Sequence, residues 1–270
     1  MQYNNSSHSS LRPARGTFRS FSIVQHNSLA SWDVFLSLMN RFDQLTSPPM
    51  IVALQDPPVR RGLLPSFSTY KCFNSPSTKP RVAFYVHPHL LNSVSLLPVR
   101  TSRWDLFSID IFTSGGLFEL QFPRFRVTNA YNLPLASTPF RTIIPTDVLR
   151  DNPFPTLVVG DFNLQHPAAD PLRTLNPKEY TISDPYKSPA SEYGFALLNQ
   201  PGLYTYFPFT HNARPSVLDL AFANRLLFPS ISRWDTHLPS TGSDHVPVLI
   251  TFDSPRFRPP DPSPNWTKTD

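Results

Sequence analysis

The chain has 270 residues, of which 40% are apolar and 13% aromatic, so it can bury a sizeable core and is not a fully disordered chain. Its 32 prolines against only 8 glycines leave room for short elements, which argues against a long coiled coil or an all-helical bundle and excludes collagen. The net charge of +5 is a modest excess that suits a polyanionic partner such as nucleic acid, and the single cysteine, Cys72, has no partner for an intrachain disulfide.

The two ends of the chain differ in composition from the middle. Residues 1–17 are rich in Ser and Asn and contain no acidic residue, which predicts a disordered N-terminal tail, with a transit peptide as the alternative. Residues 254–270 are rich in proline and poor in apolar residues, which predicts an extended C-terminal tail. Residues 18–253 are expected to form a single domain. No apolar run approaches the roughly 20 residues needed to cross a bilayer, so no membrane partner is expected.

Between the tails, short apolar runs alternate with turn-forming residues. Ser31 is a candidate helix N-cap, because apolar residues follow it at helical spacing from Trp32 to Phe42. Further helices are predicted at 140–150 and 191–199. Strands are predicted at 18–25, 50–55, 81–86, 105–112, 117–122, 125–131, 156–160, 217–223 and 246–252. This alternation indicates an α/β or α+β domain built in layers.

Polar residues capable of chemistry stand at the ends of several predicted strands. Gly160-Asp161-Phe162-Asn163 follows the apolar run 156–160, so a carboxylate and an amide two residues apart can point into one cleft. The alternative is an Asx turn, in which the aspartate only caps its own backbone.

Two further features bring a histidine and a second carboxylate. Ser243-Asp244-His245 precedes the strand 246–252, and adjacent side chains project in different directions, so Asp244 could bind a metal while His245 faces a phosphate. Asp219 lies inside the apolar strand 217–223, where a carboxylate is costly unless it is paired. An imidazole is a suitable partner, since a carboxylate that orients a histidine and stabilises its charged form recurs in catalysis.

Three other strand ends carry Asp56, Asn27 and Tyr131. Taken singly, each residue can be explained as a turn former, a cap or a boundary aromatic. Taken together, the strand ends carry in order Asn, an acid, Tyr, Asp-x-Asn, Asp and Asp-His. That ordered set is hard to reach by chance.

The ordered set resembles the endonuclease/exonuclease/phosphatase superfamily, which includes DNase I-like and apurinic-site nucleases. Within it, the chain is most similar to the endonuclease domain of non-LTR (LINE-type) retrotransposons, especially fungal ones. The resemblance runs from about Phe18 to Phe252. It is carried by QHN (25–27), IVALQDP (51–57), RVAFYV (81–86), NAYNLP (129–134), LVVGDFNLQHPAAD (157–170), SVLDLAF (216–222) and SDHVPV (243–248).

The resemblance implies a four-layered α/β sandwich with two packed mixed β-sheets and an active site at one rim. It also implies cleavage of a phosphodiester in DNA that depends on Mg²⁺ or Mn²⁺. Asn27 and Asp56 would help to hold the metal, with Asp244 nearby, because oxygen ligands suit a hard cation.

The same resemblance assigns roles to the remaining residues. Asp161 would orient or deprotonate the attacking water, and Asn163 would position that water and the phosphate. Tyr131 would hydrogen-bond a phosphate oxygen. His245, paired with Asp219, would stabilise the charge that develops on the phosphate in the transition state.

Some residues depart from the family pattern or receive no role. The family has Glu where this chain has Asp56, which shortens the reach of the carboxylate by about 1.5 Å. Arg214 is the basic residue expected nearest the site. His87 and His89 lack an evident third metal ligand, and a loop or edge strand is favoured for them.

Two alternatives to a DNA endonuclease remain open. Asp56 also fits a catalytically degenerate chain that only binds nucleic acid. A phosphoesterase of the same superfamily that acts on RNA or on small phosphoesters is the other alternative. An origin in a retrotransposon would imply an intracellular, nuclear location, and no oligomeric state is indicated.

Overall fold

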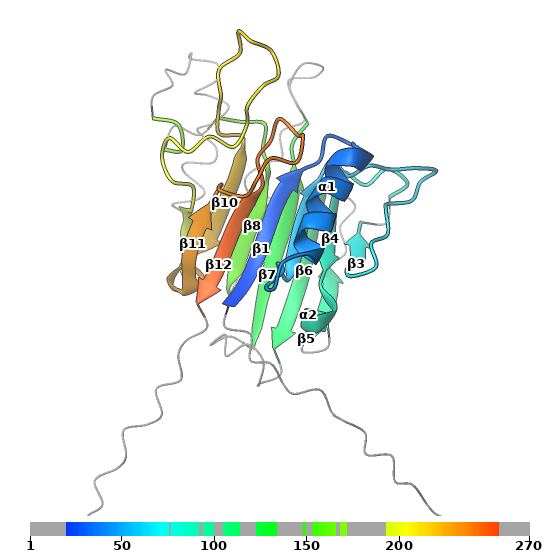
Figure 1. The fold of residues 1–270 in the computed structure, drawn as a ribbon. Helices are drawn as coiled ribbons and strands as arrows, with labels where there is room; N and C mark the ends of the chain where they lie inside the picture. The colour runs from blue at the N-terminus through cyan, green and yellow to red at the C-terminus, as the bar shows by residue number, and fades with distance from the viewer. Residues whose placement is uncertain are drawn as a thin grey trace, which may run out of the picture.

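Two β-sheets lie face to face in the computed structural model of the protein (Figure 1). The structure describes residues 20–75, 77–91, 94–99, 105–113, 123–133, 148–149, 153–165, 168–171 and 193–253. Both sheets are mixed, because β1 runs parallel to β2 in one and β7 runs parallel to β8 in the other, whereas their other neighbours pair antiparallel. The predicted two-sheet sandwich is therefore confirmed.

Each sheet has six strands. The first has the order β11-β12-β1-β2-β4-β3. Its strands are β1 (Ser20–Asn27), β2 (Ile51–Gln55), β3 (Lys71–Asn74), β4 (Val82–Val86), β11 (Ile231–Asp235) and β12 (Val248–Asp253). The second has the order β5-β6-β7-β8-β10-β9. Its strands are β5 (Val94–Val99), β6 (Leu106–Thr113), β7 (Arg124–Tyr131), β8 (Thr156–Asp161), β9 (Phe195–Leu197) and β10 (Asp219–Asn224).

The main core lies between the two sheets. Because successive side chains of a strand point to opposite faces, alternate residues of each strand enter this core. Its members include Ile23, Ile51, Ala53, Ile109, Val127, Leu157, Val159, Ala221, Val248 and Ile250. This alternation also decides which polar residues at the strand ends face inward.

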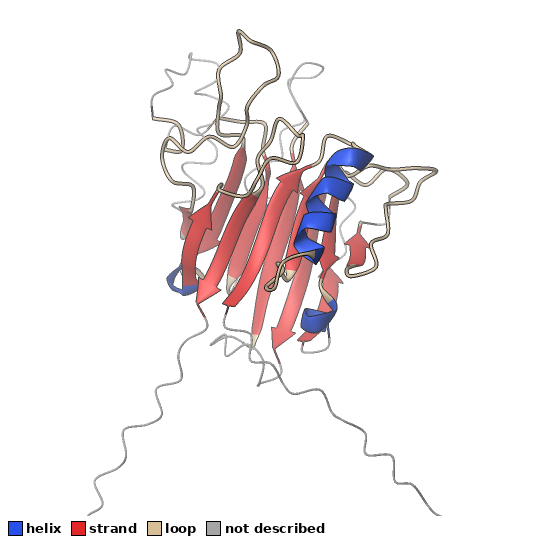
Figure 2. Cartoon of the chain, in the orientation of Figure 1, coloured by secondary structure: helices blue, strands red, loops and turns tan. Residues whose placement is uncertain are grey.

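The outer faces of the sheets are covered differently. The helix α1 (Trp32–Asp43) starts after Ser31, whose Oγ accepts a hydrogen bond from the backbone N–H of Val34 at 3.3 Å, so the predicted cap is confirmed. The helix lies on the outer face of the first sheet, as Figure 2 shows, and buries Phe35 and Leu38 against it. A separate apolar cluster that includes Phe162 and Phe222 covers the outer face of the second sheet.

The predicted helix at 191–199 is wrong. Residues Phe195–Leu197 form the strand β9, which pairs antiparallel with β10 at the edge of the second sheet. Phe195 enters the outer cluster of that sheet, and Leu197 packs against the same cluster. Phe195 and Leu197 are two residues apart, which puts them on one face of a strand but not of a helix, and the strand pairs with the edge of β10.

Besides β9, three strands were not predicted, namely β3, β5 and β11. Each lies at an edge of its sheet, and β5 contains Pro98, which only an edge strand tolerates. The remaining short elements are α2 (Pro88–Leu91) and the 3₁₀ turn Phe228–Ser230. The predicted strand 117–122, both tails and all but Val148 and Leu149 of the predicted helix 140–150 lie outside the described residues. No helix among the described residues is long and apolar enough to cross a membrane.

Candidate active site

Four of the predicted site residues meet at one rim of the sandwich because of strand register. Asp161 ends β8, and it is the direct partner of Tyr131 at the end of β7 and of Asp219 at the start of β10. These three residues occupy the inward-facing positions of their strands, in phase with the core residues Val127, Leu157 and Ala221. Asn27 is the last residue of β1 in the facing sheet, and it occupies an inward-facing position in phase with the core residue Ile23.

Asp161 is held by two amides. The Nδ2 of Asn27 donates to Asp161 Oδ2 at 2.8 Å across the gap between the sheets. Asn163 donates its backbone N–H to Oδ1 at 2.9 Å and its Nδ2 to Oδ2 at 3.1 Å. The hydrogen bond from the backbone N–H of Asn163 to Asp161 Oδ1 forms an Asx turn, which was the structural alternative for Gly-Asp-x-Asn. The Asx turn does not exclude a shared functional site, because Asn163, at φ 47°, turns its side-chain amide back towards the same carboxylate.

Asp219 and His245 form a buried pair. The Nδ1 of His245 donates to Asp219 Oδ2 at 2.7 Å, and both side chains are almost fully buried, at 4% and 1% exposed. The other oxygen of Asp219 accepts from Gln25 Nε2 at 3.3 Å, and its backbone N–H donates to Thr205 Oγ1 at 3.0 Å. Because the carboxylate takes Nδ1, the Nε2 of His245 is the nitrogen that faces Asp161, with 3.8 Å between Nε2 and Asp161 Oδ2.

Burial and neighbouring charges shift the pKa values of His245 and Asp161 away from their ordinary values. Burial lowers the pKa of His245, but the charge of Asp219 and its hydrogen bond outweigh that effect and raise the pKa to about 9. Burial raises the pKa of Asp161 to about 7, opposed by the charge of His245 and supported by that of Asp219. At neutral pH the site therefore favours a charged imidazole and a carboxylate that can take up a proton.

Asp244 lies beside this group, on the segment that leads into β12. Ser243 Oγ donates to the backbone carbonyl of Asn27 at 2.9 Å, which ties this segment to the end of β1. Asp244 Oδ1 lies 3.9 Å from His245 Nε2, and it is buried without a hydrogen-bond partner among the described residues. Burial raises the pKa of Asp244, while the charge of His245 opposes the shift.

A second set of side chains lies beyond Tyr131. Asp56 follows β2 with a left-handed backbone (φ 42°), and its side chain forms an ion pair with Arg81. The guanidinium carbon of Arg81 lies 5.6 Å from the centre of the Tyr131 ring. Burial raises the pKa of Tyr131, and the charges of Asp56 and Asp161 raise it further. Tyr131 therefore lies between the two carboxylates.

We refer to Asn27, Asp161, Asn163, Asp219 and His245 as the inner group. Asp56, Arg81 and Tyr131 are the outer group. Of the nine residues predicted for the site, seven belong to one of these groups, and Asp244 contacts the inner group. Arg214 does not join them, since it is exposed on the loop 207–215.

That loop nevertheless starts and ends beside the site. Tyr206 forms bridges with both Ser216 and His245, and the N–H of Phe207 donates to the carbonyl of Asp244 at 2.6 Å. The loop rises past the strand ends at this rim (Figure 1), and it carries the exposed side chains of Phe207, Phe209 and Arg214.

Two of the residues that support the site were missed from the sequence. Gln25 lies two residues before Asn27, and the period of a strand puts both side chains on the same inward face. The strand period in the sequence could therefore have placed Gln25 at the site. Arg81 precedes β4, and its backbone carbonyl accepts from the N–H of Asp56 at 2.8 Å. Only knowledge that β2 and β4 are antiparallel neighbours could have placed it there.

The donor atoms at this rim fit a hard divalent cation. Carboxylate oxygens of Asp161 and Asp219 lie within 4.8 Å of each other and of a His245 ring nitrogen, and the partnerless Oδ1 of Asp244 is close by. The charged imidazole of His245 has no lone pair for a metal, so the carboxylates are the donors. Two predicted ligands already have partners: Asp56 pairs with Arg81, and Asn27 Oδ1 accepts one hydrogen bond from the N–H of Leu29 at 2.9 Å, which leaves that oxygen a second lone pair. Oxygen donors predominate, as magnesium or manganese requires.

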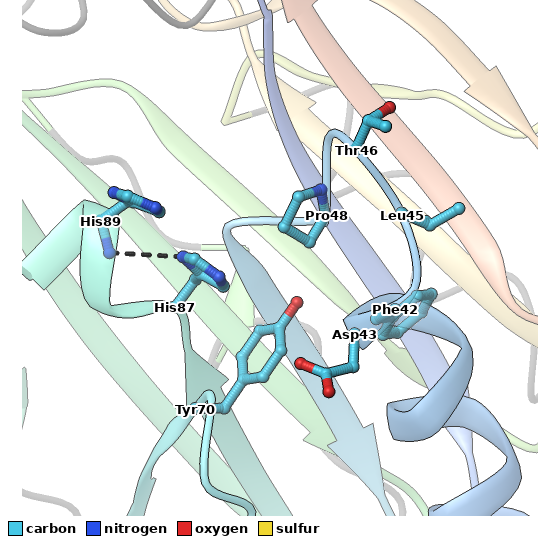
Figure 3. Close-up of a pocket in the computed structure, with 8 residues that line it drawn as sticks. All are labelled: Phe42, Asp43, Leu45, Thr46, Pro48, Tyr70, His87 and His89. Atoms are coloured by element: carbon cyan, nitrogen blue, oxygen red, sulfur yellow. Dashed lines mark hydrogen bonds between the residues drawn. The ribbon is translucent and has the colours of Figure 1, made fainter. Parts of the chain in front are cut away.

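The pair His87 and His89 lies at the opposite end of the first sheet. His87 follows the far end of β4, and its ring stacks on that of His89 with 4.9 Å between ring centres. Together with Tyr70 and Asp43 they line a cavity of about 300 Å³ (Figure 3). Among the described residues no third ligand completes a metal site with them. His87 lies in the connection that follows β4, as expected, whereas His89 lies in the short helix α2 and not in a loop or an edge strand.

Known proteins share this fold. A family described as endonuclease-reverse transcriptase matches residues 125–249. The endonuclease domain of TRAS1, a telomere-specific non-LTR retrotransposon, superposes with a TM-score of 0.67 at 15% identity, over 86% of this chain and 98% of that domain. The AP endonuclease LMAP from Leishmania major superposes with a TM-score of 0.67 at 13% identity, over 88% of this chain and 89% of its own. No curated protein matched the sequence. With its two packed mixed sheets and these superpositions, the chain has the DNase I-like sandwich fold of these nucleases.

Proposed function

We propose that this chain is a divalent-metal-dependent endonuclease that hydrolyses phosphodiester bonds of DNA and nicks a target strand. The observation that carries the proposal is the inner group. A charged imidazole fixed by a buried carboxylate points its Nε2 towards a second carboxylate, Asp161, that two amides hold. Such an arrangement suits an in-line displacement at phosphorus.

Asp161 acts on the attacking water in this mechanism. Its carboxylate has a raised pKa near 7, so it accepts a proton more readily than an ordinary aspartate at neutral pH. The amides of Asn27 and Asn163 fix the orientation of the carboxylate, and Asn163 is itself held by the carbonyl of Asn132 at 2.6 Å. The water attacks phosphorus, its proton passes to Asp161, and the bond to the leaving oxygen breaks.

His245 and Tyr131 act on the phosphate. The pentacoordinate transition state carries extra negative charge on its oxygens, and the charged imidazole donates from Nε2 to one of them. Asp219 keeps His245 charged and in this orientation. Because its pKa is raised, Tyr131 keeps its proton and can donate a hydrogen bond to another phosphate oxygen.

Asn27, Asp244 and Asp56 would hold the divalent cation, as oxygen donors at the rim between the two sheets. A bound Mg²⁺ or Mn²⁺ would neutralise charge on the phosphate and favour departure of the leaving oxygen. Asp56 can take part only if its carboxylate leaves Arg81.

The surface around the rim supports nucleic acid as the substrate. Phe209 is 69% exposed on the loop 207–215, and Arg214 lies on the same loop. An exposed aromatic ring can stack on a base, and an arginine can contact a backbone phosphate. Neither feature suits a small phosphoester, which offers no base beyond the reacting group.

Nicking of supercoiled plasmid tests the proposal. The wild type is expected to convert supercoiled into open-circular DNA with Mg²⁺ or Mn²⁺ and to stop when chelator is added. His245→Ala and Asp161→Ala are each expected to lose at least about a hundredfold in rate. Asp43→Asn removes an exposed carboxylate at the opposite end of the sheet and is the matched control. Equal nicking by all four proteins would contradict the proposal.

One observation favours a second candidate, a chain that binds nucleic acid without cleaving it. Asp56, a predicted metal ligand, is neutralised by Arg81. Salt-sensitive DNA binding by a wild type that never nicks would select this candidate. Release of inorganic phosphate from small phosphoesters, or cleavage of RNA alone, would instead select another phosphoesterase activity.

A further inference from the structure

We propose that Arg81 is a substrate-binding residue that contacts a backbone phosphate of the nucleic acid, and that Asp56 positions it while no cation is bound. This inference rests on the proposed function, since it takes nucleic acid as the ligand. It gives a role to Arg81, which the sequence analysis included in RVAFYV (81–86) without assigning it one.

The first step is the anchoring of Asp56. Its backbone carbonyl accepts from Ala30 N–H at 2.7 Å and from Ser28 Oγ at 2.9 Å, and its own N–H donates to the carbonyl of Arg81 at 2.8 Å. The carboxylate therefore starts from a backbone that is fixed on both sides. A fixed carboxylate defines where a guanidinium can lie, because the planar fork matches carboxylate geometry.

The second step is the location of the guanidinium. Arg81 lies over Tyr131, with 5.6 Å from its central carbon to the ring centre. Tyr131 is the direct ladder partner of Asp161 in parallel strands, which lie about 4.8 Å apart. The charge of Arg81 also reaches the Tyr131 hydroxyl, whose pKa it lowers against the effects of burial and the two carboxylates. Arg81 thus lies next to the place where the reacting phosphate must sit.

The third step is exposure. The Arg81 side chain is 36% exposed, whereas its partner Asp56 is 15% exposed, so the cation is the outward member of the pair. A guanidinium presents several N–H donors in a fixed planar fork. A cation that is oriented, open to solvent and beside the reacting position suits a phosphate next to the scissile one.

The test is a set of binding measurements in chelator, which separates binding from cleavage. A fluorescent DNA duplex is titrated with wild type, Arg81→Met, Arg81→Lys, Asp56→Asn and the double variant Arg81→Met/Asp56→Asn, by anisotropy at salt concentrations between about 50 and 300 mM. Arg225→Met is the control, because Arg225 is exposed just after the far end of β10. Thermal unfolding establishes that each variant is folded.

Arg81→Met is expected to weaken binding about tenfold and to reduce the slope of log K against log salt by about one. Arg81→Lys is expected to restore the slope, because it keeps the charge. The double variant separates the two possible roles of Arg81. If Arg81 binds phosphate, the double variant stays weak with the reduced slope. Recovery of wild-type binding in the double variant would overturn the inference, since Arg81 would then only neutralise Asp56.

The outcomes also separate this inference from the proposed function. A wild type that never nicks while Arg81→Met still loses one unit of salt slope would refute the endonuclease and retain Arg81 as a phosphate contact. A wild type that nicks while Arg81→Met binds DNA with unchanged affinity and slope would refute the role of Arg81 alone.

Discussion

The inner and outer groups of the candidate site contain the same kinds of interaction, yet they are built differently. In the inner group the pair of Asp219 and His245 is buried, Gln25 donates to the Asp219 carboxylate, and Thr205 accepts from the backbone N–H of Asp219. In the outer group, Asp56 and Arg81 form one ion pair whose cation is open to solvent. Because water does not reach the buried pair of Asp219 and His245, neither side chain can exchange its partner for water. Water can replace either partner in the pair of Asp56 and Arg81.

The comparison indicates a division of labour. A group that must keep a fixed protonation state during the reaction belongs where solvent cannot compete, and His245 is there. A group that must release one partner and take another, as a metal ligand or a phosphate contact must, belongs where release costs little. The predictions below test the inner group first, then its supporting strand, and then the outer group.

The largest effect is expected from Asp219→Asn. The amide cannot stabilise a charged imidazole, so the rate of plasmid nicking should fall about a thousandfold. The pKa of His245, measured by NMR, should fall from about 9 towards its ordinary range, because burial is then opposed only by the charges of Asp161 and Asp244. Asp43→Asn should change neither quantity. A variant that nicks at the wild-type rate with a lowered histidine pKa would show that the charge of His245 has no part in catalysis.

Gly160→Ala is expected to break the strand that carries Asp161. A Cβ at this position would lie 2.0 Å from the carbonyl oxygen of Ala130, its partner in β7, so the two strands would have to separate. The expected loss in the free energy of unfolding is about 3 kcal/mol, measured by denaturant titration.

Gly202→Ala is the matched control for this substitution. Gly202 has a positive φ of 81° but nothing within 4 Å of an added Cβ. Its loss should be only about 1 kcal/mol, from backbone conformation. Similar losses for the two variants would show that the close approach of β7 and β8 is not what the glycine provides.

The pH dependence of stability follows from the raised pKa of His245. The folded protein holds this proton up to about pH 9, whereas the unfolded chain releases it near 6.5. The contribution to stability is therefore complete below about pH 6.5 and disappears as the pH rises through 9. The raised pKa of Asp161, about 7, acts with the same sign, because the folded protein again binds the proton more tightly. In chelator, the free energy of unfolding should fall by roughly 1–3 kcal/mol between pH 6 and pH 9.5.

The matched variant for this pH series is His245→Gln. It lacks the titrating group, so the part of the decline between pH 7 and pH 9.5 should disappear. A decline of the same size in this variant would assign it to other groups.

The parts of the fold that could be predicted from sequence are those whose signal is local. β2, β4 and β8 have apolar runs that are buried on both faces, β12 alternates buried and half-buried residues, and α1 has both a cap and a helical period. The edge strands β3, β5 and β11 lack such runs, because one edge and much of one face are open to solvent. The helix predicted over β9 missed the pairing with the neighbouring edge of β10, which a local pattern does not report.

The candidate site divides in the same way. Asn27, Asp161, Asp219 and His245 could be predicted because each stands at an end of a buried strand, and strand ends on one inward phase meet at one rim. The partner of Asp56 could not, since Arg81 reaches it through the antiparallel pairing of β2 with β4. Sequence patterns report which residues a strand carries, but the pairing of strands decides which of them face each other.

The smallest effect is expected on the affinity of the metal-binding site for Mn²⁺ when Arg81 is replaced by Met. If Asp56 must leave Arg81 before it can hold a cation, removal of the guanidinium should strengthen Mn²⁺ binding, measured by calorimetry without DNA. A partly exposed ion pair contributes no more than about 1 kcal/mol, so the gain should not exceed about fivefold. Arg225→Met should leave the affinity unchanged, which excludes a general effect of the lost charge. A decrease with Arg81→Met would mean that Arg81 holds Asp56 in the orientation the cation needs, and the outer group would then be as fixed as the inner one.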